Sequence, residues 1–191
     1  MIKTNTSLSN EEINILKSFE GQRLISYEMK SVGGNEAWST VRLHFENGSV
    51  DIISALQIIQ EDDKGMADEF SVLRVHKVLS PDEPLVPEIE EDSHNRKVNR
   101  NVIGFSISND CVSYYSNDMW DSEITYTQAI LIDLGTDYLC IDKEAWFSEI
   151  LFVKGGDKIE ELVHDDSSSL EIDPEEDPNS RMEYSSEIVA L

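Results

Sequence analysis

The sequence predicts an α+β fold that is predominantly antiparallel β, with two related β-hairpin-rich halves and a short N-terminal helix. The first observation is a faint internal repeat: residues 41–52 read VRLHFENGSVDI, and residues 130–141 read ILIDLGTDYLCI. Both segments alternate apolar and mixed residues on either side of a turn, as hairpin strands with one buried face do. The second observation is one strong helix signal near the N-terminus. Duplication of a hairpin and a chance match of two alternating patterns both explain the repeat.

The helix is predicted by a capping box. Ser9 and Glu12 have the S-x-x-E spacing, and Leu8 with Ile13 can form the hydrophobic staple that accompanies such a cap. One apolar face follows, formed by Ile13, Leu16 and Phe19. Gly21 offers a left-handed stop after about three turns. We therefore expect a short amphipathic helix that packs against the rest of the protein.

The first half then alternates as strands. The predicted strands are 22–30, 37–46, 49–54 and 70–79, with a polar loop at 61–69. Asn47-Gly48 is a strong hairpin signal, because both central residues of a type I′ turn adopt positive φ. In 37–46 the apolar residues share one face, and the opposite face carries Trp38, Thr40, Arg42 and His44.

The chain is predicted to divide at a proline-rich stretch. Residues 1–80 form the N-terminal helix and β-rich half, residues 81–100 a Pro/acidic linker or long loop, and residues 101–163 the second β-rich half. Residues 164–191 are rich in Asp, Ser, Glu and Pro, and we expect an acidic, flexible tail.

The second half is predicted to contain hairpins joined by short turns. Its strand candidates are 102–108, 111–116, 123–134 and 138–141, and its turn signals are Asn109-Asp110, Asn117-Asp118 and Gly135-Thr136-Asp137. Residues 143–149 fit a short helix capped by Asp142, although the following residues fit a strand equally well.

The charge of the chain restricts its partners. There are 39 acidic and 15 basic side chains, which give a formal net charge of −24. Phosphate contacts need clustered Lys and Arg, so we expect no direct contact with nucleic acid and none with an anionic membrane. An acidic surface favours a basic protein partner and keeps a protein soluble, and solubility alone also explains such a composition.

The sequence favours a cytoplasmic protein. No segment approaches the roughly 20 apolar residues of a membrane span, and the first residues lack the apolar stretch of a signal peptide. The two cysteines, Cys111 and Cys140, lie in strand-like segments, and we expect reduced core thiols. The sequence does not exclude a disulfide between them, if the two segments form neighbouring strands.

The sequence contains none of the common catalytic motifs. It has no G-x-S-x-G elbow, no phosphate-binding glycine loop and no closely spaced His or Cys pairs, and its four histidines are scattered. We therefore expect no enzyme, no cofactor and no metal site. An active site assembled from dispersed residues would leave no motif, and that alternative stays open.

The resulting hypothesis is a small acidic binding protein that neutralises a basic protein partner. Immunity proteins against toxin nucleases, and other inhibitors, share this profile in broad terms only. Acidic runs and an aromatic anchor are the expected contacts, because aromatic residues dominate binding hot spots. The predicted partner-binding residues are Asp62, Asp63, Glu88, Glu90, Glu91, Asp92, Trp120 and Asp121.

Two alternatives remain beside this hypothesis. One is a phage-type anti-defence protein that mimics nucleic acid, which needs carboxylates spaced like phosphates on an ordered surface. The other is a structural or regulatory subunit without catalysis. The sequence predicts neither an oligomeric state nor the identity of a partner.

Overall fold

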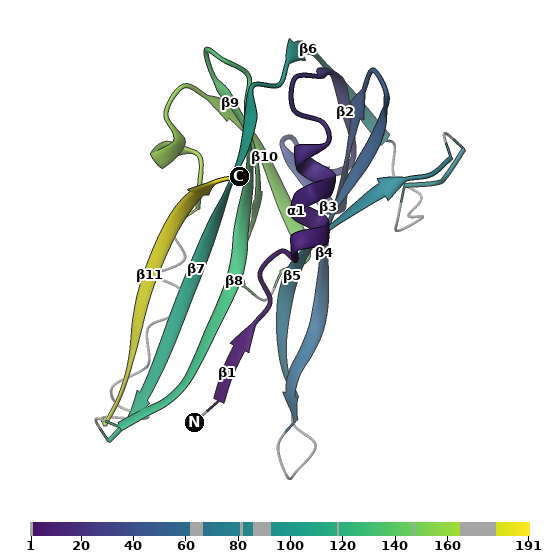
Figure 1. Ribbon diagram of the computed structural model, residues 1–191. Helices are drawn as coiled ribbons and strands as arrows, with labels where there is room; N and C mark the ends of the chain where they lie inside the picture. Colours follow the sequence, from purple (N-terminus) through teal and green to yellow (C-terminus); the bar gives the residue numbers. More distant parts are fainter. Residues whose placement is uncertain are drawn as a thin grey trace.

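The computed structural model describes residues 2–61, 67–80, 82–85, 93–117, 119–146, 148–164 and 179–191. In this part of the chain, one mostly antiparallel sheet and one short α-helix form the fold, as the sequence predicts (Figure 1). The elements are β1 Ile2–Asn5, α1 Asn10–Lys17, β2 Arg23–Gly33, β3 Glu36–Phe45, β4 Gly48–Glu61, β5 Ala67–Val78, β6 Ser93–Asn101, β7 Gly104–Ser116, β8 Met119–Asp133, β9 Tyr138–Lys143, β10 Ile150–Gly156, the 3-10 turn η1 Ile159–Glu161, and β11 Ser180–Ala190.

The sheet runs in the order β11-β7-β8-β9-β10-β3-β2-β6 and branches twice. β4 also pairs with β3 and carries β5 on its other side. β8 pairs with β7 along one side, and its other side pairs first with the parallel strand β1 and then with β9. Two long arms result, β11-β7-β8 and β4-β5, and α1 lies near the level where they join (Figure 1).

Helix α1 forms as its capping box predicts. The Ser9 N–H donates to Glu12 Oε2 at 2.8 Å, and Ser9 Oγ accepts from the Glu12 N–H at 3.3 Å. Leu16 is fully buried and Phe19 is almost so, and both belong to the main hydrophobic core. The other oxygen of Glu12 accepts from the Val75 N–H at 3.1 Å, which ties the helix to β5.

The two repeated segments both form hairpins that line this core. Their equivalent cross-strand pairs are Val41–Ile52 and Leu43–Val50 in the first hairpin, and Ile130–Ile141 and Ile132–Leu139 in the second. All eight side chains belong to the main core. Both predicted hairpins are thus present. A common origin of the two halves stays a prediction.

The turn of the first hairpin lies one residue earlier than predicted. Phe45 pairs with Gly48, so Glu46 and Asn47 form the loop. Asn47 does not adopt positive φ, and the type I′ prediction is wrong; Gly48 alone takes a positive φ, of 145°. The Phe19 ring lies 3.8 Å from the place where a Cβ on Gly48 would be, so this turn packs directly on the residue that follows α1.

The turn predicted at Asn109-Asp110 does not form, because both residues lie inside β7. Their side chains find partners across the sheet instead of in the local backbone. Asn109 Oδ1 accepts from Thr127 Oγ1 at 2.8 Å, and Asp110 Oδ2 accepts from the Tyr184 hydroxyl at 2.7 Å. Such tertiary partners outweigh the local side-chain bonds that make Asn and Asp turn formers.

Three other expectations are corrected. The end of the segment 81–100 is strand β6, paired with β2, and the end of the segment 164–191 is strand β11, paired with β7. Both strands lie at sheet edges and are largely exposed, so neither needs the apolar alternation that marks an inner strand. No helix forms in the described part of 143–149, where β9 ends at Lys143 and β10 begins at Ile150. The division of the chain into two halves stays a prediction.

The two cysteines are free thiols on strands that are not neighbours. Cys111 on β7 pairs with Thr125 of β8, whereas Cys140 on β9 pairs with Leu131 of the same strand. β8 therefore separates them and no disulfide links them. Burial raises the pKa of the Cys140 thiol, which suits an inert core residue.

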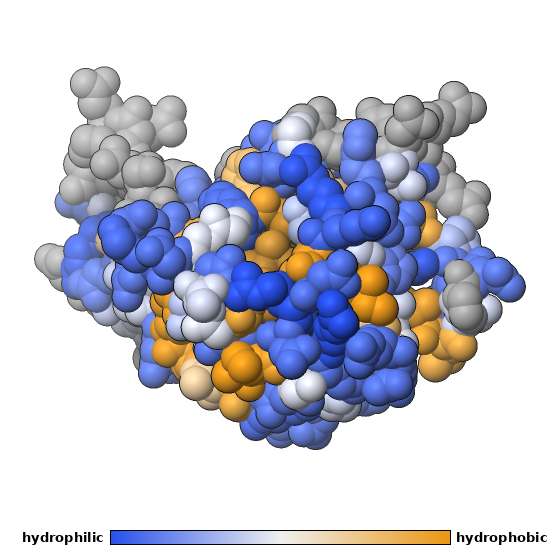
Figure 2. Space-filling model, turned by 90° about the horizontal axis from the view of Figure 1, so that it is seen from above, coloured by the Kyte–Doolittle hydropathy of each residue, from blue (hydrophilic) through white to orange (hydrophobic). Residues whose placement is uncertain are grey.

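Seen from above, hydrophilic residues cover most of the molecule, and hydrophobic residues surface in separate groups between them (Figure 2). Ile103 is the most exposed large hydrophobic residue of the β6–β7 connection, at 63%. No helix among the described residues is both long enough and apolar enough to cross a membrane.

Candidate functional site

Two of the predicted partner-binding residues can be placed. Trp120 and Asp121 lie at the start of β8, just after the β7–β8 turn. Asp62, Asp63, Glu88, Glu90, Glu91 and Asp92 lie outside the described residues. The candidate interface is therefore built on Trp120, Asp121 and what surrounds them.

A β-bulge sets the directions of these two side chains. Tyr114 pairs with Ser122 and Tyr115 with Trp120, so Asp121 is the extra residue of the bulge. A bulge twists its strand and turns a side chain away from the regular alternation. Asp121 is exposed and Trp120 is half-buried, while the neighbouring Met119 is 70% exposed.

An aromatic patch surrounds Trp120, and we define it as Lys3, Tyr115, Trp120, Glu123, Arg181 and Glu183. Lys3 Nζ lies 5.2 Å from the centre of the Trp120 ring, and the Arg181 guanidinium lies 4.0 Å from that of Tyr115. Tyr115 is the cross-strand partner of Trp120. The patch therefore joins β1, β8, β7 and β11 through two aromatic rings and two cations.

Carboxylates of the chain neutralise both cations of the aromatic patch. Lys3 Nζ contacts Glu123 Oε1 at 2.8 Å, and Arg181 Nε contacts Glu183 Oε1 at 3.3 Å. The hydrogen bond to Glu123 raises the pKa of Lys3, and the hydrogen bond that Tyr115 donates to Glu183 raises the pKa of Tyr115. Asp121 adds a further negative charge. The surface therefore presents aromatic rings with a small excess of negative charge.

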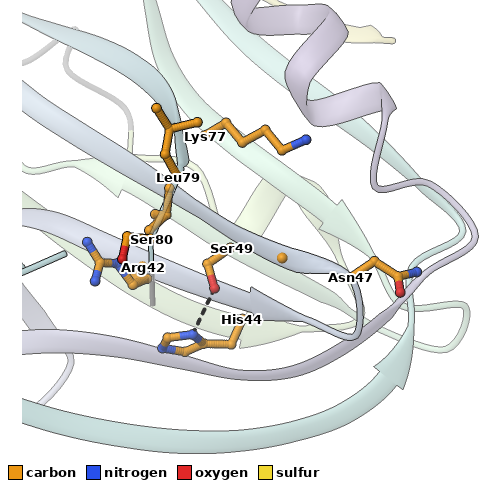
Figure 3. Close-up of a pocket in the computed structure, with 9 residues that line it drawn as sticks. Arg42, His44, Asn47, Ser49, Lys77, Leu79 and Ser80 are labelled. Carbon is orange, nitrogen blue, oxygen red and sulfur yellow. Dashed lines mark hydrogen bonds between the residues drawn. The ribbon is translucent and has the colours of Figure 1, made fainter. Parts of the chain in front are cut away.

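A pocket of about 370 Å³ opens on the other arm, beside the β3–β4 turn and the end of β5 (Figure 3). Arg42 lines it from a buried position. Its Nε and Nη2 donate to the two oxygens of Asp51 at 2.7 and 2.8 Å, and its Nη1 donates to the Glu83 carbonyl at 2.5 Å. The sequence places Arg42 on a polar strand face; that face is covered here, and the Arg42 side chain is only 6% exposed.

His44 connects three strands at the rim of this pocket. Nδ1 lies 3.1 Å from Ser49 Oγ, and Nε2 lies 3.3 Å from Glu28 Oε2. Lys77 also lines the pocket, but its side chain extends away from Arg42 and His44 (Figure 3). Both ring nitrogens of His44 and the Arg42 donors thus already have partners within the protein.

A second polar cluster is buried around Asp142 on β9. Gln128, the extra residue of another β8 bulge, donates to Asp142 Oδ1 at 2.9 Å. Lys154 Nζ and the His164 N–H donate to Oδ2 at 3.1 and 2.9 Å. Burial nevertheless raises the pKa of Asp142, because the loss of hydration outweighs these favourable contacts.

This shift predicts a pH effect on stability. Between its ordinary pKa and the raised value, Asp142 keeps its proton in the folded protein but loses it in the unfolded chain. Its contribution to stability is thus fully present at lower pH and is lost as the pH rises through that window. The Asp142→Asn variant has no such charge, so its stability relative to the wild type should improve over the pH range that begins at the ordinary carboxyl pKa of about 4 and rises from there. Urea unfolding of both proteins across this range measures the difference, and an opposite slope would contradict the buried-charge explanation.

Neither a search for metal-ligand groups nor a comparison with known proteins identifies a function for these residues. Among the residues that the structure describes, no three His, Cys, Asp or Glu side chains are grouped as metal ligands. Comparisons with protein-family models, curated proteins and solved structures found no match for this chain.

Sequence reasoning missed Tyr115, Arg181 and Glu183. They meet only because β11 pairs with β7, and Tyr115 and Glu183 are 68 residues apart. One signal was present: Met182, Tyr184 and Ile188 fall on alternate positions, as in a strand. The acidic residues that precede them hid this pattern.

Proposed function

We propose that the chain is a non-catalytic binding protein that neutralises a basic protein partner, such as a toxin or a nuclease. The observation that carries the proposal is that many Lys and Arg side chains of the protein already form ion pairs with its own carboxylates. At least six Lys and Arg side chains are tied to carboxylates of the chain itself: Lys3, Arg42, Arg100, Lys154, Lys158 and Arg181. The 39 acidic residues outnumber the 15 basic ones, so carboxylates remain in excess for a partner.

Electrostatics explains how such a protein would act. An acidic surface accelerates the encounter with a basic cleft, and at contact it covers the cationic groups that would otherwise bind nucleic acid. The aromatic patch supplies the short-range part of the contact, because aromatic rings bury much area at a small cost in conformational entropy. Asp121, beside Trp120, would face a cationic group of the partner.

The test is to capture partners from the native host and identify them. Proteins retained at about 50 mM salt and released at about 500 mM salt should be basic, because exposed charge pairs are screened within this range. With the purified partner, Asp121→Lys should weaken binding about tenfold or more. Glu20→Lys is the matched control, since it makes the same charge change at an exposed position after α1. Binding that does not change with salt concentration would contradict the proposal. An equal loss of affinity in both variants would show that the binding surface does not lie at Asp121.

A further inference from the structure

Three polar side chains follow one another across neighbouring strands at the rim of the pocket beside the β3–β4 turn. Glu28 lies on β2, His44 on β3 and Ser49 on β4, and His44 is the cross-strand partner of Ser49. His44 Nδ1 lies 3.1 Å from Ser49 Oγ (Figure 3). Nε2 of the same ring lies 3.3 Å from Glu28 Oε2. The three groups therefore form a continuous hydroxyl–imidazole–carboxylate chain.

The carboxylate of Glu28 determines which nitrogen of His44 carries the proton. An ionised carboxylate can only accept hydrogen bonds, so Nε2 is the protonated nitrogen when the neutral imidazole pairs with Glu28. Nδ1 then has the free lone pair and can only accept a hydrogen bond. Ser49 Oγ is therefore the donor in the bond to Nδ1, and its hydroxyl proton points at a base.

This arrangement is the one that activates a serine as a nucleophile. A hydroxyl is a weak nucleophile unless a base takes its proton as the new bond forms, and a third group holds that base in the required tautomer. Such a constellation is defined by geometry and by the role of each group, not by sequence positions. Glu28, His44 and Ser49 match no catalytic sequence motif, and only the pairing of three strands brings them together.

The pocket gives a small molecule access to this chain of groups. Ser49 is half-buried, and the side chains of His44 and Glu28 are 28% and 26% exposed. Ser49 and His44 both line the pocket of about 370 Å³, and Val78 and Leu79 add apolar surface to it. Sites for small molecules have volumes of about 300–1,000 Å³, so this pocket suits a ligand at the small end of that range.

The charges around the pocket leave Glu28 as the direct partner of the imidazole. Arg42 lines the same pocket, but both carboxylate oxygens of Asp51 already accept from its guanidinium. The side chain of Lys77 extends away from His44 (Figure 3). When His44 takes up the serine proton, the carboxylate of Glu28 stabilises the imidazolium that forms.

We propose that Ser49 is a reactive serine that accepts the acyl group of a small activated ester, with His44 as its base and Glu28 as the residue that positions this base. Ser49 Oγ attacks the carbonyl carbon while its proton passes to His44 Nδ1. The bond from that carbon to the leaving oxygen then breaks, and the departing alcohol takes the proton from His44. The products are an acylated Ser49 and a free alcohol. Each chain reacts once without turnover, so this inference goes beyond the proposed function and does not depend on it.

The test uses an alkyl fluorophosphonate as the probe. It reacts with an activated serine in the same way: a bond forms between Oγ and phosphorus, the phosphorus–fluorine bond breaks, and the serine proton leaves through the base. Mass spectrometry of the labelled protein and its peptides locates the adduct, which we expect at Ser49. His44→Gln should lower the labelling rate about 100-fold, because a positioned base contributes at least that much. Two matched controls should label at the wild-type rate: His76→Gln, at a residue that does not line the pocket, and Ser80→Ala, at another serine that does.

Two further measurements separate activation from folding. Labelling of the wild type should slow as the pH is lowered from about 8 to about 5, because a protonated imidazole cannot accept the serine proton, and the residual labelling of His44→Gln should not follow this profile. Glu28→Gln removes the carboxylate that positions the base, so its labelling rate should fall about tenfold or more. Glu28→Asp keeps the charge and should recover part of that rate, which a merely structural role of Glu28 would not predict.

Three results would overturn the inference. The wild type could carry no adduct, or it could carry the adduct at a residue other than Ser49; both results come from the unaltered protein and need no variant to fold. An adduct at Ser49 that forms equally fast in the wild type and in His44→Gln would identify an ordinary surface serine without a base. Circular dichroism of each variant confirms that a slower reaction does not arise from unfolding.

Discussion

Replacing Asp51 with alanine is expected to lower the free energy of unfolding by about 3–5 kcal/mol. Asp51 and Arg42 form a bidentate ion pair whose side chains are 9% and 6% exposed. Without Asp51, the Arg42 charge would remain buried beside the Glu83 and Pro84 carbonyls, which compensate only part of it. The guanidinium would not lose its proton instead, because arginine is not deprotonated in proteins even where a carboxylate partner is missing. Urea unfolding at neutral pH measures the loss.

The double variant Arg42→Met/Asp51→Leu distinguishes the contribution of the ion pair from the cost of leaving one buried charge unpaired. Both charges are then absent, and apolar side chains of similar length fill the site, so much of the lost stability should return. A loss below about 1 kcal/mol for Asp51→Ala would show that water reaches Arg42. The exposed pair Lys158–Glu161 is a suitable comparison, and its removal should have an effect of less than about 1 kcal/mol.

Replacing Phe19 with alanine should cost about 3–5 kcal/mol. Phe19 follows α1, is 2% exposed, and places its ring centre 4.4 Å from that of Phe45. Its ring also lies against Gly48, so its removal opens a cavity between the helix and the first hairpin. A protein that unfolds as one unit would show a lower urea midpoint with an unchanged slope.

Two variants set the scale for Phe19→Ala. Phe19→Leu keeps most of the volume and should cost clearly less, whereas Glu20→Ala changes an exposed neighbour and should be nearly neutral. If Phe19→Ala cost no more than Glu20→Ala, α1 would not belong to the common core.

Features with local causes could be predicted from the sequence. The capping box needs only Ser9 and Glu12, and the hairpins need only alternation on either side of a turn, so both were identified correctly. The first turn lies at residues 46–47, one residue before the Asn-Gly pair that the sequence predicts as its centre, because Gly48 pairs with Phe45 and closes the loop.

Features with distant causes could not be predicted. The sequence pattern places Arg42 on a polar strand face. In the structure the segment with Glu83 and Pro84, about 40 residues later in the chain, covers that face. β6 and β11 read as linker and tail, because edge strands bury little and need no apolar face. The same reason limits the candidate site: residue type alone points to Trp120 and Asp121, but Arg181 and Glu183 join them only through the β7–β11 pairing.

The divided pairing of β8 has a consequence for biosynthesis. Its first part pairs with β1, and Lys3 meets Glu123 across a separation of 120 residues. As the chain leaves the ribosome, β1 has no partner until β8 follows, and the outer side of β7 has no partner until β11 follows. The N-terminal hairpins and α1 can assemble before β8 has been synthesised, whereas the β1-β8-β7-β11 arm closes only after β11 has emerged. Because such distant contacts slow folding, this arm should be the last to gain protection from hydrogen exchange.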